Sequence, residues 1–238
     1  MGINPPAGPL SACESNWSRD EPYALLRCLN ALTSGRIIAP HLTVAIVRRK
    51  LQLYYCACCR LRWAEMPSDD QRSLVEMIER QVDGVASRTE WATVRGRLVI
   101  LQRELRRNDQ ALWLAPQQER IAHDRLRLIL EAVKPLRSLR QGCVCAGWSI
   151  DPAVRVAFLR ELFSNPFHPI LVDFEHITQT VRDLAHLIHH DHRFELMPVL
   201  ADALMDAGCD NAAILDHCLE SGNHIRGCWL LDQLLGEA

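Results

Sequence analysis

The sequence has no apolar run long enough to cross a membrane. Its longest apolar stretch lies between residues 51 and 59, contains Gln52, and follows three basic residues. A membrane-spanning helix needs about 20 mostly apolar residues. The first 17 residues have neither a basic start nor an apolar core, so they do not predict a secretory signal. We therefore expect a cytoplasmic protein without a membrane partner.

The sequence also lacks the short motifs that mark common catalytic sites. The phosphate-binding patterns G-x-x-x-x-G-K-[ST] and G-x-G-x-x-G are absent. So are the serine-hydrolase pattern G-x-S-x-G and the zinc-hydrolase pattern H-E-x-x-H. No catalytic residue is predicted, and a non-enzyme is favoured over an enzyme.

Lysine is scarce, because only Lys50 and Lys134 stand among 27 basic residues and the other 25 are arginines. The charge is unevenly divided: residues 1–147 have a net charge of +7, whereas residues 148–238 have a net charge of −9. Arginine pairs with carboxylates as readily as with phosphates. The two halves therefore either attract each other, or the basic half meets nucleic acid or an acidic partner.

Cysteine, by contrast, is frequent, with ten in the chain. Cys56, Cys58 and Cys59 crowd into an expected helix, and no secretory signal is predicted, so we expect reduced thiols rather than disulfides. Most should be small buried hydrophobic side chains. A zinc site that joins these three residues to Cys143 and Cys145 is the less favoured alternative.

The spacing of apolar residues predicts an all-α protein. Apolar positions recur at three- and four-residue intervals, and no segment alternates apolar and polar residues with the two-residue period of a strand. We expect a multi-helix bundle with a loose N-terminal tail over residues 1–20, a larger basic part over 21–147 and a smaller acidic part over 148–238. The alternative is that the two parts form one continuous domain.

Capping residues and prolines indicate where helices begin and end. Asp151 followed by Pro152 is typical of a helix start, and a long helix should begin near Ser87 or Thr89. Another helix is expected between a cap at Ser68 and an end at Gly84. The other expected helices cover residues 22–32, 41–63, 116–133, 178–190, 198–207, 211–220 and 224–235. The NPFHP stretch at 165–169 contains two prolines and predicts a rigid loop.

Five phrases stand out as a set. They are CACCRLRW at 56–63, LVEMIERQVDG at 74–84, LFSNPFHP at 162–169, LADALMDAGC at 200–209 and HIRGCWLLDQLLG at 224–236. With these phrases, the chain resembles an uncharacterised family of helical proteins from large-genome environmental bacteria. The resemblance implies a bacterial cytoplasmic origin, and it brings no assigned activity, cofactor or catalytic residue.

The expected C-terminal helix carries the first candidate site. His224, Cys228 and Asp232 are spaced by four residues, so they would share one stripe of that helix. One alternative function is therefore a zinc-stabilised module that uses Cys209, Cys218, His224 and Cys228 as metal ligands. In the favoured interpretation the cysteines are buried, His224 caps a helix, and no cofactor is bound.

The same helix also fits a thiol nucleophile, with Cys228 activated by a histidine and oriented by Asp232. We disfavour this reading because a reactive thiol needs a positive environment, whereas this half of the chain is acidic. Asp232 stands among apolar residues, so we expect it to be buried with Arg226, His217 or His224 as its partner.

Two further polar groups are expected at the surface. His186 and His190 fall opposite the apolar face of their helix, where they would bind metals only adventitiously. Arginines between residues 95 and 107 gather on one helix face, and nucleic-acid binding through this face is the second alternative function. No helix-turn-helix signature or aromatic platform accompanies these arginines, so nucleic acid is not the favoured partner.

The favoured function is a non-catalytic helical interaction or scaffold module of the bacterial cytoplasm that binds a protein partner. The contact residues are expected in the 165–169 loop and at the ends of the last helix. They are Asn165, Phe167, His168, Arg226, Trp229 and Asp232. The sequence predicts neither the identity of the partner nor the oligomeric state.

Overall fold

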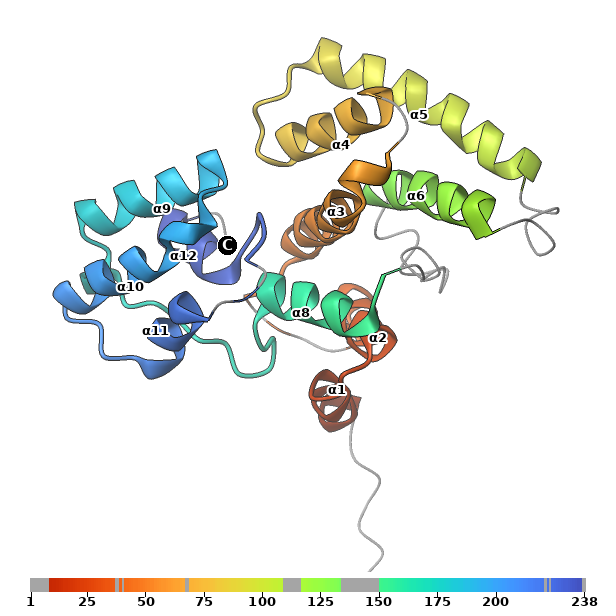
Figure 1. Cartoon of the computed structure of the whole chain (residues 1–238). Helices are drawn as coiled ribbons and strands as arrows, with labels where there is room; N and C mark the ends of the chain where they lie inside the picture. The colour runs from red at the N-terminus through yellow and green to blue at the C-terminus, as the bar shows by residue number, and fades with distance from the viewer. Residues whose placement is uncertain are drawn as a thin grey trace, which may run out of the picture. The chain divides into compact units, whose positions relative to one another are not determined.

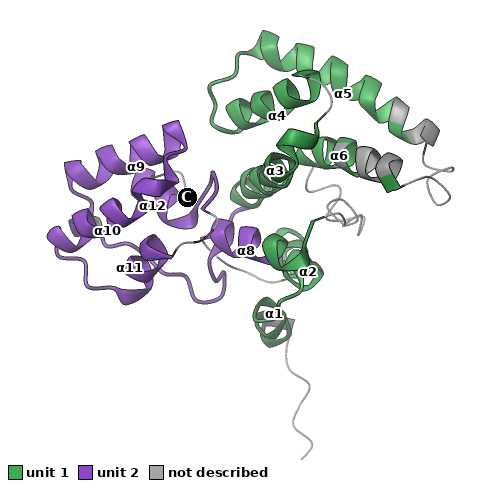
Figure 2. Cartoon of the chain, in the orientation of Figure 1, with its two compact units in different colours: residues 1–38, 44–155 green, residues 39–43, 156–238 purple. Residues whose placement is uncertain are grey.

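The computed structural model in Figure 1 describes residues 9–36, 39, 41–66, 69–108, 117–133, 150–220, 222 and 224–236. Over these ranges every regular element is a helix, which confirms the all-α, multi-helix prediction. None of these helices is long and apolar enough to span a bilayer. The chain divides into two compact units (Figure 2): unit 1 is residues 1–38 and 44–155, and unit 2 is residues 39–43 and 156–238.

Unit 1 is built around one central helix. Its described helices are α1 (Pro9–Trp17), α2 (Pro22–Thr33), α3 (Val44–Leu61), α4 (Asp69–Val82), α5 (Arg88–Asn108) and α6 (Gln117–Val133), with the short helix η1 (Trp63–Glu65) after α3. Helix α3 packs against α2, α4 and α6, and α5 packs against α4 and α6. Tyr54, Tyr55, Cys56, Cys58 and Cys59 of α3 are all buried. This central position explains why α3 is apolar on most of its sides.

Helix α1 corrects the expectation of a loose tail over residues 1–20. Residues Pro9–Trp17 are helical, α1 packs against α2, and the Trp17 side chain is buried. The Cys28 thiol on α2 also donates a hydrogen bond to the Cys13 carbonyl at 3.2 Å. A helix this short gains its stability from tertiary packing rather than from its own propensity, so its local sequence gave little signal.

Helix α5 begins where its sequence predicts. The backbone N–H of Ser87 donates to the Glu90 carboxylate at 2.8 Å, and the Glu90 N–H donates to the Ser87 hydroxyl at 3.2 Å. This reciprocal capping satisfies two backbone donors that the first turn leaves free. The apolar residues Val94, Leu98 and Leu105 are buried, as the three- and four-residue spacing of apolar positions predicts.

Helix α8 (Pro152–Phe163) contains the division between the two units. The Asp151 carboxylate accepts a hydrogen bond from the Ala153 N–H at 2.8 Å, so the predicted cap is present. The division follows Arg155, eight residues beyond the expected boundary at 147. Most of the predicted connection at 135–149, with Cys143 and Cys145, lies outside the described residues.

Unit 2 has a core formed by short helices. They are α9 (Gln179–Asp191), α10 (Met197–Asp206), α11 (Ala212–Leu219) and α12 (Trp229–Leu235), with the short helices η3 (Phe174–His176) and η4 (Phe194–Leu196). Helix α10 packs against α9 and α11, and α12 packs against α9. Their buried aliphatic residues form one continuous hydrophobic cluster, which also contains Cys209, Cys218 and Cys228.

The last helix is shorter than predicted. It begins at Trp229 rather than at residue 224, and residues 224–228 form a turn in which Gly227 has a φ of +87°. Glycine adopts this left-handed conformation without the steric cost that a Cβ would impose. His224 and Cys228 therefore do not lie one turn apart on a helix face. The prediction that they share one stripe of the last helix was wrong.

The NPFHP stretch forms the non-helical loop that its prolines predict. Within this loop the Asn165 side-chain oxygen accepts hydrogen bonds from the N–H groups of Phe167 at 2.9 Å and His168 at 3.3 Å. An asparagine that accepts from the backbone of the following residues in this way satisfies two N–H donors that have no helical partner in the loop.

Candidate metal centre

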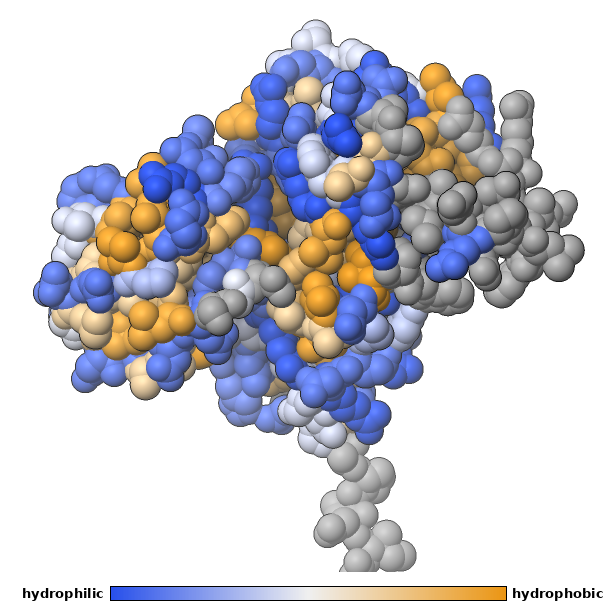
Figure 3. Space-filling view, in the orientation of Figure 1, coloured by the Kyte–Doolittle hydropathy of each residue, from blue (hydrophilic) through white to orange (hydrophobic). Residues whose placement is uncertain are grey.

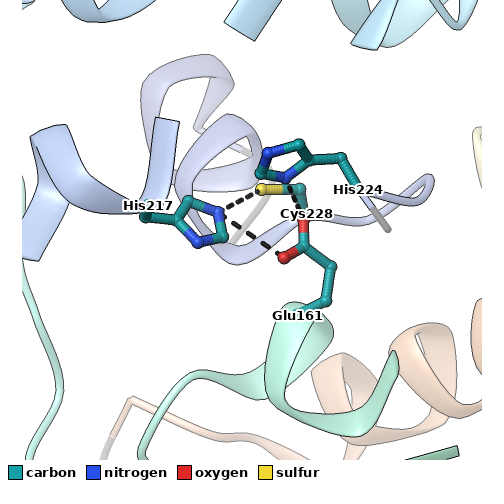
Figure 4. Close-up of side chains that lie close together, drawn as sticks. All are labelled: Glu161, His217, His224 and Cys228. Atoms are coloured by element: carbon teal, nitrogen blue, oxygen red, sulfur yellow. Dashed lines mark hydrogen bonds and ion pairs between the residues drawn. The ribbon is translucent and has the colours of Figure 1, made fainter. Parts of the chain in front are cut away.

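Four metal-ligating side chains of unit 2 point toward one another (Figure 4). They are Glu161, His217, His224 and Cys228, and each offers one ligand atom. These four ligand atoms all lie within 4.8 Å of one another. A sulfur, two imidazole nitrogens and a carboxylate oxygen form a donor set that is typical of zinc.

Each ligand stands at the end of an element or in a turn. Glu161 lies near the C-terminal end of α8, and His217 lies in the last turn of α11. His224 lies in the turn before α12, and Cys228 is the residue that precedes the first turn of α12. Two helix ends, a turn and a helix start thus place four side chains around one point (Figure 4).

The separations between these atoms fit a small cation. His217 Nε2 is 3.2 Å from Cys228 Sγ and 3.6 Å from Glu161 Oε2, and His224 Nδ1 is 3.0 Å from Glu161 Oε1. Zinc bonds of about 2.0–2.3 Å in a tetrahedron would place the ligand atoms about 3.3–3.8 Å apart. Small side-chain movements are therefore enough to bring the four groups to bonding distance.

The centre is enclosed. The side chains of Glu161, His217 and His224 are 10%, 11% and 6% exposed, and Cys228 is completely buried. The Trp229 ring lies 4.9 Å from the His217 ring, centroid to centroid, and Phe194 stacks on His224 at 6.5 Å. Aromatic walls exclude water and strengthen electrostatic interactions inside the site.

The pKa values of the two histidines shift in different directions. Burial lowers the pKa of His217, and the charge of Glu161 offsets this only in part. Burial also acts to lower the pKa of His224, but the hydrogen bond and the charge of Glu161 outweigh it, so that pKa is raised. A lowered pKa leaves His217 neutral near neutral pH, which is the form that binds a metal.

Cys228 is a neutral thiol unless a cation replaces its proton. Burial raises the pKa of the Cys228 thiol well above its ordinary value of 9.0, and the charge of Glu161 raises it further. A bound divalent cation reverses this balance, because a coordinating thiol loses its proton to the metal. The same burial argues against a nucleophilic Cys228, since a reactive thiol needs access and a lowered pKa.

The structure brings together only part of the predicted zinc quartet. His224 and Cys228 belong to the converging group, whereas Cys209 and Cys218 are buried in the hydrophobic cluster and are not members of it. Burial, aided by Cys209, raises the pKa of Cys218 to about 12. His217 could have been predicted from the sequence, because it is adjacent to Cys218. No nearby residue in the sequence indicates that Glu161 belongs to the group.

The predicted contact residues fall into two groups. Trp229 and Asp232 are buried, so a surface role for them is wrong, although the expected burial of Asp232 is confirmed. Arg226 is half-buried, and its guanidinium lies 3.4 Å from His192 Nε2. The loop residues Asn165 and Phe167 are half-buried, whereas His168 is exposed.

The other sequence-predicted clusters do not form a second centre within the described residues. Cys56, Cys58 and Cys59 are buried, and burial raises the pKa of Cys58 to about 12. His186 and His190 are exposed, as predicted. Across the part of the chain that the structure describes, no other three such side chains converge on one point.

The arginine face of α5 is only partly open. Arg95 and Arg103 are exposed, whereas Arg97 forms an ion pair with Asp70 of α4 at 3.2 Å. The side chains of Arg106 and Arg107 lie outside the described residues.

Comparisons of the chain with family models, with curated proteins and with solved structures each found no match.

Proposed function

We propose that unit 2 is a zinc-stabilised helical module, and that the chain is a non-catalytic interaction or scaffold protein. The observation that carries this proposal is the convergence of Glu161, His217, His224 and Cys228 within 4.8 Å. The thiolate and the imidazoles favour zinc over calcium or magnesium, which take oxygen ligands at larger coordination numbers.

The number of ligands supports a structural ion. Structural zinc sites take four protein ligands in a tetrahedron, whereas catalytic sites keep one position for water or substrate. Here four protein groups are available, and no more than 11% of any of the three partly exposed side chains is accessible. An ion bound by all four would be closed to substrate.

The ion would join segments that are distant along the chain. His217, His224 and Cys228 come from one short segment, but Glu161 is 63 residues from His224. Joining α8 to the α11–α12 segment closes a long loop, which lowers the conformational entropy of the unfolded chain. Unit 2 would thereby gain a rigid scaffold despite its short helices.

Elemental analysis of the purified full-length chain tests this proposal. We expect one zinc per chain, and we expect Cys228→Ser and His217→Gln to lose most of it because each removes a ligand. Cobalt replacement should give the visible absorption of a tetrahedral ion with a sulfur-to-metal charge-transfer band, which Cys228→Ser abolishes.

Cys209→Ser and His186→Gln are the matched controls, because they change a buried thiol and an exposed imidazole outside the centre. Both should keep stoichiometric zinc. A folded chain that takes up no zinc, or whose zinc content is unchanged by Cys228→Ser, would contradict the proposal.

A further inference from the structure

A cavity of about 380 Å³ lies beside the metal centre in unit 2. Its apolar walls are Phe194, Met197, Pro198 and Leu219, and His224 also lines it. This volume falls within the range of about 300–1,000 Å³ that ligand-binding cavities occupy. Since His224 belongs to both the centre and the cavity, the two sites share a wall.

The helices α10 and α11, which supply part of the lining of the cavity, expose apolar side chains. Figure 3 shows hydrophobic surface over α10 and α11. The exposed apolar residues of these two helices are Val199, Met205 and Leu219, of which Leu219 is 55% exposed and lines the cavity. Apolar surface of this kind, at the mouth of a cavity, is a feature of binding sites.

The segment that supplies most of the lining of the cavity carries charge of one sign. Between residues 194 and 225 the chain has six acidic residues and no lysine or arginine. All six are exposed: Glu195, Asp202, Asp206, Asp210, Asp216 and Glu220. Of these, Glu195 pairs with Arg193 at 2.9 Å, and in the described ranges no ion pair involves the other five. Glu195 and Glu220 line the cavity, and of these two the carboxylate of Glu220 is the one without an ion pair among the described residues.

One ring nitrogen of His224 has no hydrogen-bond partner among the described residues. Its Nδ1 faces Glu161, whereas its Nε2 is buried and makes no hydrogen bond to any described residue. A histidine that binds a metal through one nitrogen donates the N–H of the other to an acceptor, often a carbonyl.

We propose that this cavity binds a basic peptide segment of a partner protein. An apolar side chain of the segment packs against Phe194, Met197 and Leu219, a backbone carbonyl accepts the His224 Nε2–H, and flanking arginines or lysines meet the exposed carboxylates. The inference rests on the proposed function, because the metal fixes the proton of His224 on Nε2. Nucleic acid and anionic lipid are disfavoured, since the acidic segment 194–225 repels both.

The probe is the blocked peptide acetyl-Gly-Arg-Leu-Leu-Arg-Gly-amide, titrated into the zinc-loaded full-length chain and followed by NMR. We expect saturable shifts of the amides around the cavity and of the His224 Nε2–H. The acidic counterpart, with glutamate in place of arginine, should bind at least tenfold more weakly. Salt should weaken the basic peptide, because exposed charges are screened.

Two pairs of variants compare residues that line the cavity with exposed residues of the same segment that do not. Leu219→Ser should weaken peptide binding at least fivefold, whereas Met205→Ser, at an exposed position of α10 outside the cavity, should leave it unchanged. Glu220→Gln should weaken binding about threefold, whereas Asp210→Asn should not. All four positions are exposed, so each variant should remain folded.

Each contrary result contradicts either the peptide-binding inference, the proposed function, or both. Equal binding of the acidic peptide, or binding unaffected by Leu219→Ser, would overturn the inference, as would sedimentation showing that a second copy of the chain occupies the cavity. Zinc without peptide binding would contradict the cavity alone and leave the proposed function standing. Peptide binding by a chain that holds no zinc would overturn the role of His224 and the proposed function together.

Discussion

Burial sets the chemistry of the ionisable side chains in both units. Cys228 and Cys58 are both completely buried, and burial raises the pKa of each thiol above its ordinary value of 9.0. A buried neutral thiol usually acts as a small hydrophobic side chain. Cys228 differs from Cys58 because two imidazoles and a carboxylate converge on it, so a divalent cation can take the place of its proton.

Glu131 in unit 1 gives a prediction for the pH dependence of stability. Burial raises the pKa of this carboxyl to about 7, although a hydrogen bond from Tyr55 and the charge of Arg127 act to lower it. Because the folded chain holds the proton more tightly than the unfolded chain, this group contributes stability below pH 4.5 that is lost as the pH rises through about 7. The loss amounts to up to about 3 kcal/mol.

Urea unfolding of the wild-type chain and of Glu131→Gln at several pH values between 5 and 8 tests this prediction. The neutral amide has no proton to lose, so the variant should lose less stability than the wild type as the pH rises. Glu76→Gln, on an exposed position of α4, should behave as the wild type does. Parallel stability curves for the wild type and Glu131→Gln would show that burial does not hold the proton.

At the scale of elements, the turn before α12 matters more than the helix itself. A helix over residues 224–235 would separate His224 and Cys228 by one helical turn on a single face. The observed turn instead places the His224 ring 5.0 Å from the His217 ring, edge to face, while Cys228 begins the helix. Shortening the helix by five residues is therefore what lets three ligands from one segment converge.

Gly227 is the residue on which this turn depends. Gly227→Ala should reduce zinc affinity at least tenfold, because a Cβ at a φ of +87° is strained and the relaxed backbone moves His224 relative to Cys228. The control is Gly236→Ala, at the C-terminal end of α12 with a φ of +73° and no atom within 4 Å of the added Cβ. Competition with a chromophoric chelator measures both affinities.

Both glycine variants should lose about 1 kcal/mol of stability through backbone strain. Only Gly227→Ala should also lose zinc affinity. Equal zinc affinities in the two variants would mean that the turn does not set the geometry of the centre.

At the scale of the whole molecule, several arginines of unit 1 form ion pairs and hydrogen bonds with other groups of the same unit. Arg60 of α3 forms an ion pair with Glu79 of α4 at 2.6 Å and lies over the Trp63 ring, and Arg80 pairs with Glu90 at 3.2 Å. Arg155 is buried, and its Nε donates to the Tyr54 hydroxyl at 3.0 Å. These contacts favour the interpretation in which arginine is present to pair with groups of the protein rather than with phosphates.

The proposed zinc ion gives a prediction for the stability of the whole chain. A ligand at 100 times its dissociation constant stabilises the folded state by about 2.7 kcal/mol. In a domain the size of unit 2, each kcal/mol moves the unfolding temperature by about 4–8 °C. A chelator should therefore lower the unfolding temperature of unit 2 by roughly 10 °C or more.

Calorimetry with and without the chelator measures this effect, and amide hydrogen exchange assigns it to a unit. Cys228→Ser should not respond to the chelator, whereas Cys209→Ser should respond as the wild type does. Hydrogen exchange that increases equally in α3 and α12 on chelation would contradict a stabilisation confined to unit 2.

The sequence by itself determined the features that depend on near neighbours along the chain. The all-helical fold, the capping of α5 by Ser87 and Glu90, the start of α8 at Asp151 and the loop at 165–169 all follow from residues within a few positions of one another. The burial of Cys56, Cys58 and Asp232 was also predictable, because apolar neighbours surround each of them in the sequence.

Only the tertiary structure decided the candidate metal centre and the helix at the N-terminal end. Glu161 joins His224 across 63 residues, and no local pattern encodes a contact between side chains so far apart along the chain. Helix α1 depends on packing against α2, and the turn at Gly227 depends on the position of α12. Helical periodicity is a property of adjacent residues, whereas a centre built from separate segments exists only once folding has brought them together.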